Sequence, residues 1–494
     1  MNSTGANAEN RYRVVFVAGL AGTAVLQAFL ATRLPLTHQE GLNLLVSRLI
    51  NNGYAPYTEI FTLANPLFVG LLGWLGRLGL TPTGFRGVFL AFSTLLLIDV
   101  ALIARHWFGW QAALASAFLL AGATTFLGNA AGIAPVIPAQ SVGALSLLLT
   151  LHYLKSSRLT WQFLAGVLWG IALFVSISAL SLALVNLLLV VFAGQARGAA
   201  GAASLTRGNV LRALGTWLAG AIIAVAAGVA LASPEIVFEH ILATYSTIGH
   251  NLRASQAANF KATGHFLVSN LWLALFAVAG ITQADETPDH PLWIAVMWGL
   301  FSFSWLMLQR LLQPVDLDIL LPPLAIVAGW GLVGAGQRLH RYYRGSRPAR
   351  HRALGIGLGL LFLGLYVAVT WRGLNGFIWR DIDNQDYFTQ YQRRQEVVEL
   401  IQAHTAAGDC VIIDDAALAV AADRLPAPQL VGLSRERLAA GLITREEFVA
   451  VVEENGCTAA VFSSRRYTLS ELRDWARTYY PHEQRVMRTR IYYR

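Results

Sequence analysis

The topology of this chain depends on one apolar stretch, residues 66–80, whose sequence is PLFVGLLGWLGRLGL. It follows a polar segment that begins with residues 37–41 (THQEG), and it precedes a long apolar run near residues 86–105. If the stretch crosses a membrane, every later loop changes sides. If it is a juxtamembrane or re-entrant helix, the chain returns to the face from which it started. Each later loop then lies on the side opposite to the one it would have if the stretch crossed. The choice between these two topologies decides which loops share a side.

The composition identifies the solvent around the chain. The 494 residues are 55% hydrophobic and only 13% charged, and the mean hydropathy is +0.51. This is too apolar for a water-soluble globular protein. Runs nearly free of charge recur along the first three quarters of the chain, each near the ~20 residues that a helix needs to cross the hydrocarbon. Lipid cannot satisfy open backbone groups and no barrel-strand pattern is present, so we predict an all-α polytopic membrane protein.

We expect about eleven transmembrane helices, each of spanning length, in a domain that covers residues 1–372. They are predicted near residues 12–31, 86–105, 109–127, 139–155, 160–175, 177–194, 211–232, 262–282, 290–309, 317–337 and 353–372. The runs 160–175 and 177–194 read either as a hairpin or as one strongly tilted helix, and the hairpin is favoured. The first run lacks a small-residue cleavage signature, which predicts a retained signal anchor.

Basic residues decide between the two topologies. When residues 66–80 return to their starting face, the basic loops share the side of Arg11 and Arg13. Those loops carry Arg105, Lys155, Arg158, Arg197, Arg207, Arg212, Arg338, Arg341, Arg344, Arg347, Arg350 and Arg352. Loops rich in Lys and Arg stay in the cytoplasm. We therefore predict a multi-pass protein of the cell (plasma) membrane with a cytoplasmic N-terminus and a first external loop at residues 32–85.

The sequence becomes charged and mixed after the last predicted span, which indicates a separate domain at residues 373–494. Buried strands are predicted at residues 410–413 and 459–462 and a last strand near residues 491–492, with helices before and between them. An odd number of crossings precedes this small α/β domain. We therefore expect it on the extracytoplasmic side.

The chain has two cysteines, Cys410 and Cys457, and each stands at the start of a predicted strand. Adjacent strands could bring them within bonding distance in an oxidising compartment. Two unlinked buried thiols are nevertheless the favoured interpretation.

The same count of crossings places three polar segments on the outer side: the first loop, residues 233–261 and residues 309–318. They supply Glu40, Arg48, Tyr57, Glu59, Asn65, Arg86, Glu235, Glu239, His240, His250, Arg253, Lys261, Arg310, Asp316 and Asp318. We expect the chemistry on this face. No zinc-type spacing, phosphate-binding glycine loop or dinucleotide fingerprint occurs in a convincing context, so no metal ligand is assigned. The net charge of +9 implies no nucleic acid, because cytoplasmic arginines can contact anionic head groups.

Several elements of the first outer loop occur in a fixed order. An apolar span is followed by Glu40-Gly41, an amphipathic stretch with Gly53-x-x-Pro56-Tyr57, an acidic residue, Pro66-Leu67 and an arginine before the second span. Together they resemble the first external loop of the GT-C glycosyltransferases, especially the dolichyl-phosphate-mannose protein mannosyltransferases and the bacterial lipid A aminoarabinose transferases. Residues 310–323 resemble the turn before the penultimate core span of that family. An extracytoplasmic C-terminal domain is common there.

The resemblance implies transfer of a sugar from a polyprenyl-phosphate donor to a lipid, glycan or protein acceptor on the outer face. This reaction needs a carboxylate to deprotonate the attacking hydroxyl. It also needs cations near the phosphate that leaves. Membrane lipids are the other expected partners. No cofactor is certain, and a divalent cation could assist, although the outer acids show no diagnostic spacing.

By position in the pattern, Glu40 and Glu59 are the predicted catalytic carboxylates. The residues predicted to bind substrate or donor phosphate are Gln39, Tyr57, Asn65, Arg86 and Arg310. Plainer interpretations exist as well. Glu40 could simply stabilise a helix N-terminus through the macrodipole, and arginines at span ends commonly contact head groups.

The sequence departs from the family pattern at Gln39, which stands where the usual catalytic Asp is found. Glutamine cannot take up a proton at neutral pH, so Glu40 or Glu59 has taken over, or the protein is a lapsed relative that acts in binding or assembly. A lipid or solute transporter is the third interpretation. Transporters favour paired intramembrane charges and internal repeats, whereas this chain shows one acid within a span, Asp99, and no evident repeat. Reassigned catalysis is the favoured interpretation.

Overall fold

The computed structural model of the protein describes residues 3–196, 207–244, 256–283, 290–309, 312, 314–344, 364–366, 368, 370, 387–434, 437–438, 440–463, 470–486 and 489–494. Its contacts divide the chain into two compact units. The helical unit comprises residues 1–32, 86–228 and 255–378, and the mixed unit comprises residues 33–85, 229–254 and 379–494. Residues 33–85, which were predicted as the first outer loop, therefore belong to the same compact unit as the C-terminal segment. The predicted boundary at residue 372 stays a prediction.

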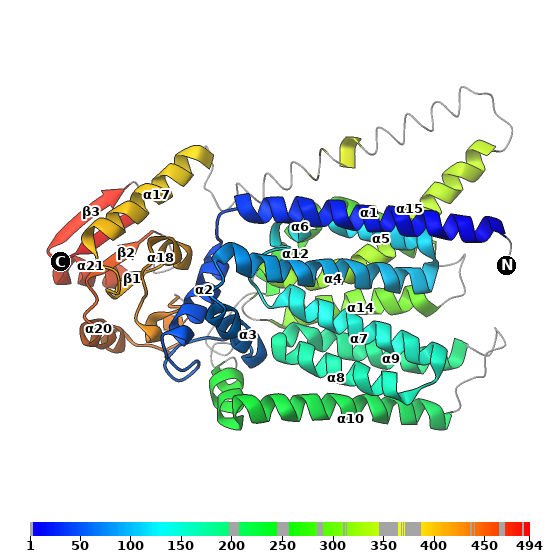
Figure 1. Cartoon of the computed structure of the whole chain (residues 1–494), viewed down its shortest axis with the longest axis horizontal. Helices are drawn as coiled ribbons and strands as arrows, with labels where there is room; N and C mark the ends of the chain where they lie inside the picture. The colour runs from blue at the N-terminus through cyan, green and yellow to red at the C-terminus, as the bar shows by residue number, and fades with distance from the viewer. Residues whose placement is uncertain are drawn as a thin grey trace. The chain divides into compact units, whose positions relative to one another are not determined.

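Long apolar helices build the helical unit (Figure 1). They are α1 (Ser3–Arg33), α4 (Pro82–Phe108), α5 (Trp110–Ala121), α7 (Val136–Ser156), α8 (Leu159–Val175), α9 (Leu180–Ala196), α10 (Arg207–Ala232), α12 (Gln256–Ser269), α13 (Leu271–Ile281), α14 (His290–Leu308) and α15 (Leu321–Arg344). Short helices α6 (Thr124–Asn129), η1 (Ile177–Ala179) and η5 (Pro314–Leu320) connect them.

The described helices confirm an all-α polytopic membrane fold. Six of them are long and apolar enough to cross a membrane, or seven if the bent pair α12–α13 counts as one span. The apolar helices at residues 110–121, 159–175 and 177–192 are shorter. The predicted last span near residues 353–372 lies outside the described residues, apart from 364–366, 368 and 370.

Contacts at both ends of α1 and α4 answer the question about residues 66–80. Arg105, late in α4, pairs with Glu9, early in α1, at 2.9 Å. Arg86, early in α4, donates to the carbonyl oxygen of Ala31, late in α1, at 2.7 Å. The two helices are antiparallel, so the segment between them starts and ends on one side. Within it, the 12-residue helix α3 (Pro66–Arg77) is about 18 Å long and too short for the ~30 Å core. This geometry agrees with a stretch that does not cross, and the topology stays a prediction.

Two predicted spans contain breaks. The run 262–282 is bent by 91° between α12 and α13, with Asn270 at the break. The run 109–127 ends as a helix at Ala121 and resumes as the short α6. The pair at residues 160–194 divides at Ser176, whose backbone is extended. That division agrees with two helices rather than with one tilted helix.

Close helix contacts in this unit depend on glycine. A Cβ atom at Gly166 of α8 would lie 2.0 Å from the carbonyl oxygen of Trp217 of α10. A Cβ atom at Gly331 of α15 would lie 2.0 Å from the carbonyl oxygen of Phe276 of α13. Small residues allow such approaches, which provide the packing contacts that hold helices together in lipid.

The mixed unit combines the loop helices with a small α/β fold. Its elements are α2 (His38–Asn51), α3, the π-helix η3 (Ile236–Ala243), α17 (Tyr387–His404), β1 (Val411–Ile413), α18 (Ala416–Ala422), η6 (Pro428–Leu430), α20 (Arg445–Glu454), β2 (Ala459–Phe462), α21 (Ser470–Tyr479), β3 (His482–Val486) and β4 (Thr489–Tyr493). The sheet order is β1-β2-β4-β3. β1 and β2 are parallel, and β4 is antiparallel to β2 and β3. The three predicted strands are present, and β3 was not predicted.

The two cysteines form a disulfide, so the prediction of unlinked thiols is wrong. Parallel pairing places Val411 opposite Ala459, and this register brings the residues just before the two strands together. The Cα atoms of Cys410 and Cys457 are 4.3 Å apart. Because nothing in the local sequence specifies that β1 and β2 are neighbours, the pairing could not be predicted from the cysteines alone.

The loop and the C-terminal segment share a hydrophobic cluster. It consists of Val46, Leu49, Tyr57, Ile60, Val69 and Val431. Val431 follows η6, whereas the other members come from the first outer loop. The loop is thus packed as part of a domain and does not stand alone.

Candidate functional site

Glu40 occupies the third position of α2 and is part of a capping box. Its Oε2 atom accepts from the backbone N–H of Thr37 at 2.9 Å, and its own N–H donates to the Thr37 hydroxyl at 3.2 Å. The residue is 3% exposed. Such a reciprocal pair satisfies two donors that the first turn of a helix leaves open. The carboxylate therefore has a structural role at this end of α2, whatever else it does.

Three other predicted residues lie in the loop between α2 and α3. Glu59 is exposed, and its Oε2 atom accepts from the N–H of Ala55 at 2.5 Å. Tyr57 has a φ of 72°, a conformation that L-residues seldom adopt. Its hydroxyl donates to the carbonyl of Ala64 at 2.7 Å, and its ring joins the shared cluster. Asn65 caps α3, where its carbonyl accepts from Val69 at 3.1 Å.

The remaining predicted residues are distributed between the two units. Gln39 follows the first residue of α2 and is half-buried. Arg86 belongs to the helical unit, where it is 7% exposed and bonds to Ala31. Arg310 lies outside the described residues. The structure thus brings Gln39, Glu40, Tyr57, Glu59 and Asn65 into one unit, and their predicted roles stay predictions.

The first turn of α2 is joined to the first turn of α18. His38 Nδ1 accepts from the backbone N–H of Ala416 at 3.2 Å. Asp415 caps α18 by accepting from Ala417 at 3.0 Å, and it pairs with Arg394 of α17 at 2.9 Å. Burial alone would raise the pKa of the Asp415 carboxyl, but His38 and the Arg394 guanidinium outweigh it and hold that pKa well below its ordinary value of 3.8.

We call the contact between α2 and α18 the seam. At Gly41 it is too close for a side chain, because an added Cβ atom would lie 2.4 Å from the backbone nitrogen of Ala417. Near the other end of α2, Arg48 pairs with Asp423 at 2.9 Å. The Glu-Gly pair of the sequence pattern therefore has a packing explanation, in which the glycine lets the two helices touch.

A second polar cluster lies in the helical unit. Asp318 of η5 is 2% exposed, and its Oδ2 atom accepts from Asn129 Nδ2 at 2.7 Å. One turn earlier on α6, Thr125 accepts from Asn270 Nδ2 at 3.1 Å. Within the described part of the chain, Asp318 Oδ1 and Asn270 Oδ1 are buried without a hydrogen-bond partner. The cluster therefore presents acceptors that a donor group of a ligand or a water molecule could satisfy.

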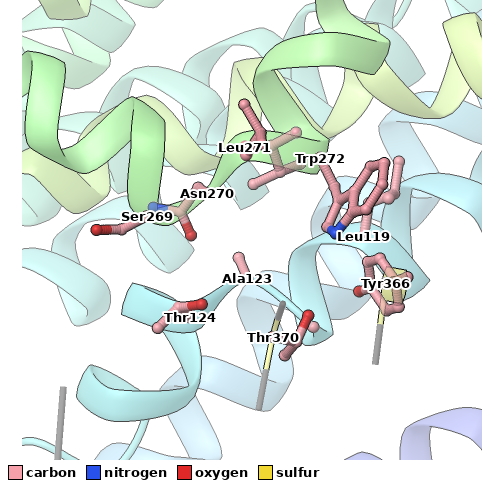
Figure 2. A pocket seen from close by; sticks show the side chains of 11 residues that line it. Leu119, Ala123, Thr124, Ser269, Asn270, Leu271, Trp272, Tyr366 and Thr370 are labelled. Atoms are coloured by element: carbon pink, nitrogen blue, oxygen red, sulfur yellow. The ribbon is translucent and has the colours of Figure 1, made fainter. Parts of the chain in front are cut away.

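The break between α12 and α13 forms a small pocket next to Asn270. It is lined by Leu119, Gly122, Ala123, Thr124, Ser269, Asn270, Leu271, Trp272, Leu273, Tyr366 and Thr370. Figure 2 shows Ser269 and Asn270 across from Thr124, with Trp272 and Tyr366 along one side. The surface that lines this small pocket is almost wholly apolar, so it offers a ligand little hydrogen bonding.

Sequence reasoning missed His38, Arg394 and Asp415, which lie far apart in the chain and meet only through the fold. It also assigned no role to Asn129 or Asn270. One signal was available for Glu40, since Thr37-x-x-Glu40 has the spacing of a capping box. That spacing predicts the start of a helix, and it therefore gives Glu40 a structural role in addition to the predicted catalytic one.

Comparison with known proteins gives matches in structure but not in sequence. No protein-family model matches the chain, and no curated protein matches its sequence. ArnT from Cupriavidus metallidurans bound to undecaprenyl phosphate superposes with a TM-score of 0.67 at 16% identity, over 97% of each chain. Its apo state gives 0.65 at 15% identity, over 97% of this chain and 98% of ArnT.

A third match is the archaeal oligosaccharyltransferase AglB from Archaeoglobus fulgidus in complex with an inhibitory peptide and a dolichol-phosphate. Its TM-score is 0.51 at 13% identity, over 90% of this chain and 69% of AglB. These identities establish the fold and not the activity. The arrangement of the helices and the C-terminal sheet confirms the predicted resemblance, and this chain has the fold of the GT-C glycosyltransferases.

Proposed function

We propose that this protein is a membrane glycosyltransferase that moves a sugar from a polyprenyl-phosphate donor to an acceptor at the outer face of the membrane. The observation that carries the proposal is a common fold over 97% of both chains with ArnT, whose structure contains undecaprenyl phosphate. AglB, which shares the fold, was captured with dolichol-phosphate. Two neighbours thus have a polyprenyl phosphate in common, and this supports the same class of carrier here.

In the proposed reaction an acceptor hydroxyl attacks the anomeric carbon of the sugar. The bond between that carbon and the phosphate oxygen breaks, the lipid phosphate leaves, and the hydroxyl proton passes to a carboxylate. Glu40, with Glu59 as its partner, is the proposed source of that carboxylate. Arg86 and Arg310 are proposed near the phosphate, where guanidinium groups match its oxygens. Gln39, Tyr57 and Asn65 are proposed to bind substrate.

The disulfide supports the proposed orientation. Disulfides persist in oxidising compartments and are rare in the cytosol, and Cys410 and Cys457 are bonded. An extracytoplasmic C-terminal domain, a cytoplasmic N-terminus and the cell membrane as location follow as parts of the proposal. Thiol labelling of intact cells after reduction tests this. Labelling of Cys410 and Cys457 by an impermeant reagent supports an outer location, and labelling only after permeabilisation contradicts it.

The decisive assay measures transfer of radiolabelled sugar from undecaprenyl-phosphate-linked donors in membranes that carry the wild type or a variant. Glu40→Gln keeps the capping box, since glutamine also serves at this position, but it removes the base. Thr37→Ala weakens the cap and keeps the carboxylate. We expect Glu40→Gln to lower the rate at least about a hundredfold, as loss of a general base does, and Thr37→Ala to have a much smaller effect.

Glu59→Gln is the parallel test of the second carboxylate. If neither Glu40→Gln nor Glu59→Gln loses activity, the site assignment is wrong even when the wild type transfers sugar. If the wild type transfers none from any donor, the proposed function itself is wrong.

A lapsed relative is the alternative that one observation favours. The carboxylates of Glu40 and Glu59 both accept backbone N–H groups, and Gln39 stands at the position where the family has its acid. Restoring the acid with Gln39→Asp separates the two cases. A large gain in transfer over an inactive wild type indicates a lapsed enzyme, whereas no gain over an active wild type supports reassigned catalysis.

A further inference from the structure

We infer that the C-terminal part of the mixed unit positions the proposed site, and that His38 and Asp415 are the positioning residues. The inference rests on the proposed function, because the residues that are positioned are Gln39 and Glu40. Neither His38 nor Asp415 is proposed to contact the acceptor, the sugar or the phosphate. They act by fixing the first turn of α2, on which Gln39 and Glu40 lie.

The contact between α2 and α18 depends on backbone N–H groups at the start of α18. The first N–H groups of a helix have no partner within the helix. Asp415 satisfies the N–H of Ala417 with its side chain, and His38 of the loop satisfies that of Ala416. Arg394 of α17 holds the other oxygen of Asp415 at 2.9 Å. The N–H of Ala416 thus has a fixed direction, and His38 can accept it only through an Nδ1 atom that carries no proton.

The rest of the seam leaves α2 little freedom to adjust. Gly41 touches the backbone of Ala416 and Ala417 with no space for a methyl group. Two residues separate His38 from Gly41, so both contacts lie within one turn of α2. Gln39 and Glu40 stand between these two fixed points. A displacement of about 1 Å in a group that orients a substrate is enough to slow a reaction about a hundredfold.

Protonation provides a way to test this link. Neutral imidazole can accept at Nδ1, whereas protonated imidazole donates from both nitrogens. Among the described residues, the charged groups that face His38 are Asp415, whose Oδ1 atom lies 3.7 Å from Nδ1, and Arg394, which pairs with Asp415. A protonated His38 would turn to Asp415 and leave the N–H of Ala416 without an acceptor. The seam is therefore complete only while His38 is neutral.

The experiment compares His38→Leu with His38→Asn in full-length protein. Asparagine places an acceptor oxygen close to the position of Nδ1 and stays neutral, whereas leucine has no acceptor. With a donor that the wild type uses, we expect His38→Leu to lower kcat at least about tenfold with KM changed less than about threefold. His38→Asn should restore kcat to within about threefold. Arg48→Gln, at the far end of α2, is the control and should stay near wild type.

Two readouts separate positioning from stability. The melting temperature of His38→Leu should stay within about 4 °C of the wild type while kcat falls. On acidification the kcat of the wild type should fall by more than that of His38→Asn, because imidazole loses its acceptor at Nδ1 when it takes up a proton and asparagine does not. A loss of kcat that follows the melting temperature overturns the inference, as does a pH profile that is the same in both proteins.

A labelling experiment tests positioning without activity. The protein has no free cysteine among its residues, because Cys410 and Cys457 are bonded to each other. Gln39→Cys therefore introduces a single thiol on the first turn of α2. We expect its rate of reaction with a maleimide to change at least about threefold when His38→Leu is added and less with His38→Asn. Equal rates in all three proteins contradict the inference, even if the wild type transfers no sugar.

Discussion

The carboxylates of the two units differ in how their oxygens are used. In the mixed unit, Glu40, Glu59 and Asp415 each accept a backbone N–H, and Asp415 also pairs with Arg394. In the helical unit, Asp99 and Asp318 each bury an oxygen that has no hydrogen-bond partner among the described residues. The acids that the sequence pattern singled out, Glu40 and Glu59, therefore each hold a backbone N–H group. The buried acids with an oxygen that has no hydrogen-bond partner among the described residues lie in the helical unit.

The difference matters because the two kinds of acid affect stability in opposite ways. A carboxylate that caps a helix stabilises it by about 0.5–2 kcal/mol. A buried carboxylate with an unsatisfied oxygen destabilises the fold, and within membrane spans such acids are retained mainly for function. The comparison leads us to expect that Gly41→Ala, Asp415→Asn and Asp423→Asn in the mixed unit change stability and that Asp318→Asn in the helical unit changes activity.

The largest expected effect is at the seam. Gly41→Ala places a methyl group 2.4 Å from the nitrogen of Ala417, and a backbone atom in a short helix cannot move aside. We expect a loss of more than about 3 kcal/mol of stability, measured by thermal unfolding in detergent. Gly70→Ala on α3 is the matched control, because nothing lies within 4 Å of its added Cβ atom. It should be neutral or stabilising by up to about 1 kcal/mol. Equal melting of both variants would show that the seam is not tight.

Asp318→Asn should have the next largest effect, on transfer and not on stability. Asparagine keeps the shape and can still accept from Asn129, while an amide N–H₂ group replaces the oxygen that has no partner. We expect the melting temperature to stay about the same, and transfer to fall at least about tenfold if that oxygen contacts a substrate, as the loss of a hydrogen bond would predict. Asp99→Asn, in the middle of α4, is the comparison for a buried acid in a different setting. Unchanged transfer in Asp318→Asn would assign that residue to structure.

Periodicity was enough to predict the apolar helices, the division at Ser176 and the two central strands. Each depends on neighbours in sequence: run length and apolar content. The break at Asn270 was missed, because a bend inside an apolar run carries no charge signal. The short edge strand β3 was missed because His482, Glu483 and Arg485 are exposed there, so it lacks the apolar alternation of a buried strand.

The site was predicted less completely than the fold. Gln39, Glu40, Tyr57, Glu59 and Asn65 do gather in one unit, as their common loop implies. The seam contacts of two other residues of α2, His38 and Arg48, come from residues more than 350 positions away. Only the packing of α18 on α2 brings these residues together. A motif in one loop can nominate a residue, but it cannot reveal which distant helix holds that residue in place.

Asp415→Asn should have a moderate effect that depends on pH. The folded protein holds the pKa of Asp415 below its ordinary value of 3.8, so ionised Asp415 stabilises the fold at pH values above about 4. That contribution is lost as the pH falls through the lower, folded-state pKa. We expect the variant to be less stable than wild type by about 1–3 kcal/mol at neutral pH, with the difference shrinking as the pH falls below about 4. A difference that grows as the pH falls below about 4 would contradict the assignment.

The smallest effect should be at the outer end of the seam, where Arg48 pairs with Asp423 at 2.9 Å. The side chain of Asp423 is 77% exposed, so water and salt screen the pair. Asp423 has a φ of 56°, and asparagine tolerates this conformation as well as aspartate does. Asp423→Asn therefore removes the charge without straining the backbone. We expect a loss of less than about 1 kcal/mol, which disappears in about 1 M salt because the Debye length falls to about 3 Å. A larger loss of stability that persists in salt would contradict this expectation. It would mean that the Arg48–Asp423 pair stabilises the contact between α2 and α18 as much as His38 and Gly41 do.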